Sequence, residues 1–327
     1  MRIRVIHTGG TIGMRPGPHG LATAPGWLAG ELMRQYPYVD VHEYVQLLDS
    51  SSMTPADWVR IAQDVAESAE GYDGFLVLHG TDTLAWTAAA LAYQLQGLGK
   101  PVLLTGAMRP WGAAESDAPR NVAAALAWLE SAHQATIGVV FAGRLWPATR
   151  VRKMDCDALD AFSAPNAAAL AVFEAGGWQL AMTSNALTIG EPLQPLAADA
   201  RVLHLTLAPG CNADWLAAQL RQSPPDGLLL STYGSGNAPA HPALLEVLTR
   251  LAGRIPMVNL TACPRGTVAM GQYAAGNALA AAGLWSGGDM TPEAALVKLH
   301  WLLAQPQPLA MLRQRFETCV AGDRTPA

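Results

Sequence analysis

The chain has 327 residues, of which 50% are hydrophobic and 14% are charged, and its formal net charge at pH 7 is −5. A chain of this length and composition predicts a globular protein with more than one domain. The acidic balance and the lack of any long basic run argue against nucleic acid and anionic membrane as partners. No secretory leader and no membrane span is recognised, so we expect a cytoplasmic protein.

The cysteines are widely spaced and form no C-x-x-C pair: Cys156, Cys211, Cys263 and Cys319. Such a pattern predicts neither a zinc site nor a disulfide framework. We expect these residues to be ordinary thiols.

The first predicted element is a strand over residues 2–6, and the sequence HTGGTIG follows it at residues 7–13. A glycine-rich turn of this kind can bind a phosphate or can expose a threonine side chain. The dinucleotide fingerprint G-x-G-x-x-G would need glycine where Thr11 stands, and the chain contains no G-x-x-x-x-G-K-[ST] loop. The spacing disfavours phosphate, so the turn either presents Thr11 or is simply tight.

An amphipathic helix is predicted after DSSSM, with Thr54 as its cap and Pro55 in its first turn. Beyond it, apolar runs such as GFLVLHG and KPVLLTG alternate with alanine-rich helical stretches such as LAWTAAALAYQLQ and NVAAALAWLESA. This alternation is typical of an α/β fold with a mainly parallel sheet. We expect a larger N-terminal domain of flavodoxin-like or Rossmann-like type.

The alternation weakens between Gly176 and Asp199, where Pro192 and Pro195 interrupt it. It resumes in RVLHLTLAPG, DGLLLSTYGSGNAP and IPMVNLTACPRG. We therefore predict an N-terminal catalytic α/β domain at 1–180, a linker at 181–200 and a smaller C-terminal α/β domain at 201–327.

Hydroxyl and charged residues follow several of the predicted N-terminal strands. In open α/β sheets, ligands bind beyond the carboxyl ends of the strands, so these residues are expected at one edge of one sheet. Taken singly, each has a structural explanation as a helix cap, a turn residue or a solvated charge. Their convergence favours a site formed by Thr11, Ser50, Ser51, Thr81, Asp82, Thr105, Gly106, Ala107 and Lys153.

Such a set is suited to nucleophilic acyl transfer. A threonine hydroxyl must lose its proton as it attacks, and it needs a nearby base and a site for the developing oxyanion. A lysine in a cleft can act as the base, and a neighbouring carboxylate can orient it or hold a cationic part of the substrate. Thr81, Asp82 and Lys153 could form that arrangement.

The motifs that carry these residues resemble those of the bacterial-type L-asparaginases, specifically the cytoplasmic type I group. TGGTIG is similar to the first family signature and HGTDT to the second. DSSSMTPADW, KPVLLTGAMRP, DALDAFSAPN, YGSGNAP and MGQYAAGNALAAAG resemble further family segments in the family's order, over essentially the whole chain. The resemblance implies hydrolysis of the asparagine side-chain amide to aspartate and ammonia through an acyl-enzyme, without metal or cofactor.

The resemblance also implies roles for individual residues. Thr11 would be the nucleophile, and Thr81, Asp82 and Lys153 would form a second catalytic group in which Asp82 also holds the substrate's α-amino group. Asn237 would reach the site from a partner subunit, because the family builds its sites across intimate dimers, so a homodimer or a dimer of dimers is expected. The substrate-binding positions would be Ser50, Ser51, Gly80, Ala107 and Asn237.

Two positions depart from the family's pattern. The family's loop tyrosine, which closes over the substrate, falls in register at Leu21, so either turnover is slowed or another group such as His19 supplies the contact. At the effector site of some members, Cys263 matches but Ser231 replaces an arginine, so allostery is not predicted.

Other functions remain open on these residues. One is an amidase of the same fold that acts on glutamine or on an amide within a larger molecule, although the acidic charge disfavours a tRNA-linked amide. Another is a binding protein that keeps the pocket but has weakened turnover. An oxidoreductase is disfavoured because the dinucleotide fingerprint fails.

Overall fold

The computed structural model describes residues 1–131, 135–181, 191, 193–210, 212–239, 241–271 and 274–326. The chain divides into two compact units, Met1–Gln194 and Pro195–Ala327. The predicted linker at 181–200 lies across this division, and residues 182–190 and 192 within it are outside the described residues. In the described part of the chain, every helix is too short or too polar to cross a bilayer.

The N-terminal unit is built on a mainly parallel sheet. Eight strands of the described residues form it in the order β12-β11-β8-β7-β6-β5-β1-β4. The pairs from β4 to β7 are parallel, and the pairs from β7 to β12 are antiparallel. The strands are β1 (Ile3–Gly9), β4 (Val39–Leu48), β5 (Gly74–Leu78), β6 (Val102–Thr105), β7 (Ile137–Phe141), β8 (Arg144–Pro147), β11 (Ala171–Glu174) and β12 (Gly177–Leu180).

The parallel half of this sheet has a topological switch point between β1 and β5. From β1 the chain first builds β4 at the sheet edge and then returns to build β5, β6 and β7 on the other side of β1. This is the flavodoxin-like order, in which ligands bind at the carboxyl ends of the two strands flanking the switch point. The predicted α/β fold with a larger, mainly parallel N-terminal sheet is confirmed.

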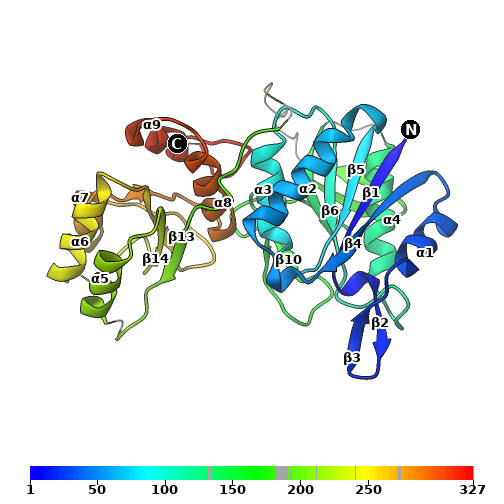
Figure 1. Ribbon diagram of the computed structural model, residues 1–327, viewed down its shortest axis with the longest axis horizontal. Helices are drawn as coiled ribbons and strands as arrows, with labels where there is room; N and C mark the ends of the chain where they lie inside the picture. The colour runs from blue at the N-terminus through cyan, green and yellow to red at the C-terminus, as the bar shows by residue number, and fades with distance from the viewer. Residues whose placement is uncertain are drawn as a thin grey trace. The chain divides into compact units, whose positions relative to one another are not determined.

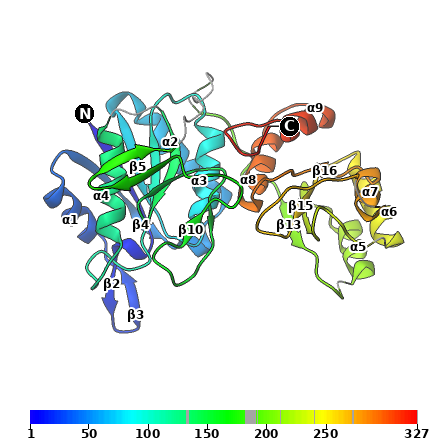
Figure 2. The ribbon, with the colours of Figure 1, turned by 180° about the vertical axis from the view of Figure 1, so that it is seen from behind.

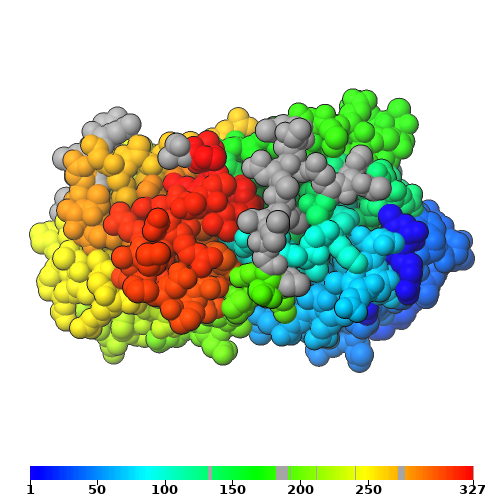
Figure 3. Space-filling view, turned by 90° about the horizontal axis from the view of Figure 1, so that it is seen from above, coloured from blue at the N-terminus to red at the C-terminus, as the bar shows by residue number. Residues whose placement is uncertain are grey.

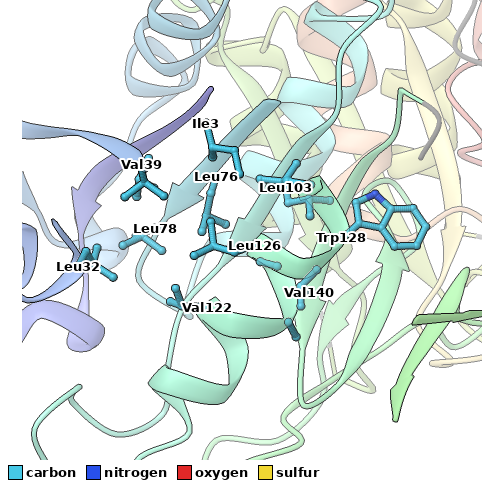
Figure 4. Close-up of a cluster of buried hydrophobic side chains, with 14 of the residues drawn as sticks. Ile3, Leu32, Val39, Leu76, Leu78, Leu103, Val122, Leu126, Trp128 and Val140 are labelled. Carbon is cyan, nitrogen blue, oxygen red and sulfur yellow. The ribbon is translucent and has the colours of Figure 1, made fainter. Parts of the chain in front are cut away.

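Helices cover both faces of the sheet (Figure 1). The helices α2 (Pro55–Glu67) and α3 (Leu84–Gln94) lie on one face, and α1 (Trp27–Gln35) and α4 (Ala118–Glu130) lie on the other. Because successive strand residues point to opposite faces, alternate residues of β1 and β5 enter the core beneath α1 and α4. Figure 4 shows this core, which includes Ile3, Leu32, Val39, Leu76, Leu78, Leu103, Val122, Leu126, Trp128 and Val140.

The predicted start of the second helix is confirmed. The amide and hydroxyl of Thr54 both donate to the Asp57 carboxylate at 2.8 Å, which completes a capping box with Pro55 at the first helical position. The helix is amphipathic as predicted: its apolar face, formed by Trp58, Ile61, Ala62 and Val65, is buried.

Short elements complete the N-terminal unit. The 3-10 turn η1 (Thr11–Gly13) leads into a hairpin of β2 (Met14–Gly17) and β3 (Gly20–Thr23) that projects from the body of the unit in Figures 1 and 2. The others are η2 (Ser50–Ser52), η3 (Ala69–Gly71) and a small ribbon of β9 (Arg152–Lys153) and β10 (Phe162–Ser163).

The C-terminal unit has a smaller parallel sheet, as predicted. Its described strands are β13 (Val202–Thr206), β14 (Gly227–Thr232), β15 (Met257–Thr261) and β16 (Trp285–Ser286), in that order. Its described helices are α5 (Ala213–Gln222), α6 (Pro242–Ala252), α7 (Ala274–Ala281), α8 (Pro292–Leu303) and α9 (Leu309–Glu317). The last helix lies against α8, and Figure 3 shows the red atoms of this segment at the surface of the unit.

A buried ion pair ties the end of the chain to α8. Lys298 Nζ lies 2.6 Å from Asp323 Oδ2, and both side chains are fully buried. The same amine donates to the carbonyls of Phe316 and Thr318. Removing one partner would leave a buried charge without compensation, so the pair holds the last segment in place.

Candidate active site

Glycines let the backbones of three strand ends meet at the switch point. A Cβ on Gly10 would lie 2.4 Å from the amide nitrogen of Gly80, and a Cβ on Gly80 would lie 2.4 Å from Ser50 Oγ. A Cβ on Gly106 would lie 2.4 Å from the His79 carbonyl oxygen. Contacts this short exclude any side chain, so the turns after β1, β5 and β6 pack against one another because these residues are glycine. The result is a compact edge that brings Thr11 and Thr81 into one neighbourhood.

Thr11 opens the 3-10 turn directly beyond β1. Gly10 before it has φ of +92°, a conformation that favours glycine, and the Ile12 carbonyl accepts a hydrogen bond from the Trp111 amide. Ile12 and Gly13 are buried, whereas Thr11 is only partly buried. The Thr11 hydroxyl makes no hydrogen bond to any described residue. The turn therefore presents this hydroxyl unengaged.

Lys153 joins Thr81 and Asp82 in one cluster. Its Nζ lies 2.9 Å from Thr81 Oγ1 and 2.8 Å from Asp82 Oδ1. Thr81 is 8% exposed, the Lys153 side chain 19% and the Asp82 side chain 62%. The hydroxyl and amine are thus largely withdrawn from bulk water, while the carboxylate faces outward.

The route by which Lys153 reaches this cluster differs from the prediction. We expected it to follow a strand of the main sheet, but β7 turns back as the antiparallel β8, and Lys153 lies on β9 in the separate ribbon. The amine comes from outside the sheet, whereas the hydroxyls come from the carboxyl ends of its strands. A tight β7–β8 hairpin through Ala142 and Gly143, both at positive φ, explains the reversal.

Ser50 and Ser51 follow β4 at the same edge. Asp49 accepts the Ser51 amide at 3.0 Å, which closes the η2 turn, and the Ser50 carbonyl accepts the Thr83 hydroxyl at 2.7 Å. Ser50 is buried against Gly80, whereas Ser51 is exposed. The two serines thus face different surroundings, and Ser50 contacts the turn that carries Thr81.

Ala107 lies beyond β6 and is almost fully buried. The buried Asn121 of α4 holds this strand end, because its amide donates to the Gly106 carbonyl at 3.1 Å and its oxygen accepts the Ala142 amide at 3.0 Å. Asp117 accepts the backbone amides of Met108 and Arg109. The loop after β6 is therefore rigidly supported next to the site.

The remaining residues singled out in the sequence lie on other elements. Asn237 belongs to the C-terminal unit, where its backbone closes a tight turn with Tyr233 through two hydrogen bonds of 2.8 Å. Leu21 lies on β3, pairs with Pro16 across the hairpin and is 51% exposed. Ser231, the second departure from the family's pattern, is hydrogen-bonded to His204 Nε2 through its hydroxyl at 2.8 Å.

Sequence reasoning missed the histidine beneath the site. His79 is fully buried, its Nδ1 donates to the Gly80 carbonyl at 2.7 Å, and its Nε2 accepts the Thr87 hydroxyl at 2.8 Å. Burial lowers the pKa of His79 to about 4, so the ring is neutral near pH 7. Its place directly before GTDT was the signal that could have identified it, because that residue must end the strand beneath the turn.

One exposed group of described residues has ligand atoms close enough for a metal, namely Asp155, Cys156 and Asp157. The Asp155 carboxylate already accepts the amides of Asp157 and Ala158, and these hydrogen bonds lower the pKa of Asp155. The group is explained as a closed turn, so it supports no metal site.

Fold and site together define a class: an α/β protein with an unengaged hydroxyl and a hydroxyl–amine–carboxylate cluster at the switch point of its larger sheet. Residues 2–185 match the family model described as "Asparaginase, N-terminal", and residues 201–316 match "Glutaminase/Asparaginase C-terminal domain". The chain belongs to the asparaginase family.

Individual relatives match this chain over nearly its full length. The chain is 40% identical to L-asparaginase 1 of Escherichia coli strain K12, covering 99% of this chain and 98% of that protein. The crystal structure of L-asparaginase I from Vibrio cholerae superposes with a TM-score of 0.89 at 37% identity, covering 99% of both chains. A probable cytoplasmic L-asparaginase from Campylobacter jejuni gives a TM-score of 0.79 at 26% identity, covering 96% of this chain and 98% of that one.

Proposed function

We propose that the protein is an L-asparaginase that hydrolyses L-asparagine to L-aspartate and ammonia. The observation that carries the proposal is the cluster in which Lys153 Nζ contacts both Thr81 Oγ1 and Asp82 Oδ1, beside a turn that presents an unengaged Thr11 hydroxyl. The family assignment over both units supports it. The proposed catalytic residues, Thr11, Thr81, Asp82 and Lys153, all lie in the proposed catalytic domain at 1–180.

In the proposed mechanism, Thr11 Oγ1 attacks the side-chain amide carbon, and its proton passes to a base as the new C–O bond forms. The tetrahedral intermediate collapses, the C–N bond breaks, and the nitrogen takes up a proton and leaves as ammonia. Water then attacks the ester carbon, and the C–O bond to Thr11 breaks to release aspartate and restore the hydroxyl. No metal or cofactor takes part in these steps.

The second cluster acts as one unit in this scheme. In its neutral form the Lys153 amine can accept the Thr81 proton over the 2.9 Å that separates the two groups. The ionised Asp82 keeps the amine aligned, and its exposed oxygen can bind the α-amino group of the substrate. Ser50, Ser51, Gly80 and Ala107 are assigned to the substrate-binding surface around these groups.

The test is ammonia release from asparagine and, in parallel, from glutamine, by wild type and by Thr11→Ala. We expect turnover of asparagine by wild type and a loss of at least about a thousandfold in Thr11→Ala, with an unchanged melting temperature, because the attacking atom is gone. Mass spectrometry after rapid quenching should find the acyl group on Thr11. Full activity in the variant, or an acyl group elsewhere, would reject Thr11 as the nucleophile.

We further propose that the protein works in the cytoplasm as a homodimer or a dimer of dimers, in which Asn237 completes the site of a neighbouring subunit. The Campylobacter jejuni relative is named as cytoplasmic. Mixing Thr11→Ala with Asn237→Ala, each nearly inactive alone, should restore activity through hybrid dimers with one intact site. Subunit exchange without any recovery would show that Asn237 serves no shared site.

A further inference from the structure

Glu43 of β4 holds two segments that are distant along the chain. Its Oε2 lies 2.9 Å from His7 Nδ1, and its Oε1 accepts the Gly26 amide at 2.6 Å. Both carboxylate oxygens are thereby used, one on β1 and the other at the residue before α1. His7 and Glu43 are direct neighbours in the register of β1 and β4, so their side chains point to the same face of the sheet.

His7 carries this contact to the turn of Thr11. A Cβ on Gly13 would lie 2.7 Å from His7 Cε1 and 2.8 Å from His7 Nε2, so the imidazole ring packs directly against the end of η1. The His7 side chain is fully buried and that of Glu43 is 15% exposed. The pair is therefore a buried support beneath the three-residue turn that Thr11 begins.

The protonation of the pair follows from its surroundings. Burial lowers the pKa of His7, and the hydrogen bond and charge of Glu43 oppose this only in part. The neutral ring must carry its hydrogen on Nδ1, because that nitrogen faces the carboxylate. Nε2 then has no hydrogen to donate, which fits a position against Gly13 without a hydrogen-bond partner among the described residues.

Gly13 and Gly26 bracket the segment that contains the β2–β3 hairpin. In the described structure this hairpin pairs only within itself, and every residue of β3 is exposed. Beyond its two ends, the hairpin contacts the unit through Arg15, which lies over the ring of Trp27 directly after Gly26. Glu43 contacts one end directly and the other end through His7.

We propose that Glu43 is a positioning residue which, through His7 and the Gly26 amide, fixes both ends of the hairpin segment and thereby the orientation of Thr11. The proposal rests on the proposed role of Thr11 as nucleophile. The residue does not touch the substrate. It sets the direction of the attacking hydroxyl, so its loss reduces turnover more than substrate affinity, which depends on Ser50, Ser51 and Asp82.

Glu43→Gln is the sharpest variant, because it keeps the size of the side chain but leaves one acceptor oxygen for two donors. The matched control is Glu31→Gln on α1, which removes a partly exposed carboxylate paired with Arg34. We expect Glu43→Gln to lower kcat on asparagine about tenfold with KM within about twofold, and the control to change neither. His7→Phe keeps the ring against Gly13 but removes the hydrogen bond, and it should lower kcat similarly.

Hydrogen exchange separates positioning from general destabilisation. In Glu43→Gln, amides of residues 11–26 should exchange at least several-fold faster, while those of the central strands remain as in wild type. An unchanged kcat in an otherwise active enzyme, or faster exchange throughout the sheet, would overturn the proposal. If wild type itself fails to turn over asparagine, the proposed function fails, whereas local exchange still decides whether Glu43 holds the hairpin ends.

Discussion

The parallel strands of both sheets of this protein are followed by polar residues and glycines at their carboxyl ends, yet the two edges differ in one respect. At the C-terminal sheet, the Thr232 hydroxyl donates to Asn259 Oδ1 at 2.7 Å, and the Asn259 amide donates to the Gly236 carbonyl at 2.9 Å. Thr232 and Asn259 are fully buried. At the N-terminal sheet, the Thr11 hydroxyl is unengaged, and the Thr81 cluster ends in the largely exposed Asp82.

This difference shows what turns a sheet edge into a site. Position beyond the strands is common to both edges, and so are the glycines: a Cβ on Gly236 would lie 2.9 Å from Asn259 Nδ2. In the C-terminal network each polar atom is satisfied internally, so it stabilises the fold and is closed to ligands. At the N-terminal edge, the Thr11 hydroxyl and the outward-facing Asp82 carboxylate can still form hydrogen bonds, and a substrate can bind to these groups.

Loss of the amine should break the N-terminal cluster most severely. Lys153→Met keeps the length of the side chain but removes both hydrogen bonds, so we expect kcat/KM on asparagine to fall by about a hundredfold or more. Lys100→Met is the control, because that partly buried amine donates to the backbone carbonyls of Ala69 and Tyr72 away from the site. Equal activities of the two variants would make Lys153 a structural lysine.

A methyl group at Gly10 should separate the packed turns. Gly10→Ala combines a strained φ of +92° with a contact of 2.4 Å to backbone, so we expect the free energy of unfolding to fall by about 3 kcal/mol. Gly20→Ala is the control, since its φ is +116° but a Cβ there meets nothing within 4 Å. Both variants are unfolded in urea, and the difference between their losses of unfolding free energy gives the cost of the steric contact apart from backbone strain. Equal losses would mean that the close packing is unimportant.

Acid should lower the free energy of unfolding through His79, the buried histidine beneath the site. The pKa of His79 is lowered from 6.5 to about 4 on folding, so between these pH values the unfolded chain binds a proton that the folded chain excludes. The free energy of unfolding therefore declines as pH falls through this window, by up to about 3 kcal/mol from this residue. Unfolding followed from pH 7 to pH 4 should show a shallower decline in His79→Gln.

The smallest effect is expected at the closed edge. Thr232→Val removes a buried hydroxyl that donates to Asn259 Oδ1 and the Leu260 carbonyl, so it should cost about 1–2 kcal/mol of unfolding free energy. Turnover per folded molecule should stay near wild type. Thr249→Val is the control, because its exposed hydroxyl donates only within its own helix. A large loss of turnover in Thr232→Val would mean that the C-terminal edge contributes to activity as well as to stability.

Much of the fold could be predicted from the order of apolar strands and alanine-rich helices. The site hydroxyls could be placed because parallel strands bring residues after each carboxyl end to one edge, whatever lies between them in sequence. Lys153 shows the limit of that reasoning, since the β7–β8 hairpin sends the chain away from the sheet before β9 returns. In the sequence, residues 138–147 (GVVFAGRLWP) look like a single strand, because a two-residue hairpin turn leaves a weak local signal.

The supporting residues were harder to predict. Gly10 against Gly80 and His7 against Gly13 are contacts between segments whose meeting depends on register and turn geometry, which periodicity does not specify. His7 and His79 also look unremarkable within apolar strands, because a buried histidine satisfied by its neighbours leaves no pattern in a single sequence. The role of Glu43 likewise depends on a cross-strand partner and a distant amide.

The ribbon that delivers Lys153 also sets how the protein should respond to heat. Its strands β9 and β10 contain two residues each, and one of its contacts with the sheet is made by Phe162, whose ring centroid lies 4.7 Å from that of Phe141. Elements with so few backbone hydrogen bonds open at a lower free energy than the strands of a central sheet. Inactivation should therefore precede melting: over some range of temperature the sheet stays intact while the amine leaves Thr81, and cooling restores the working arrangement.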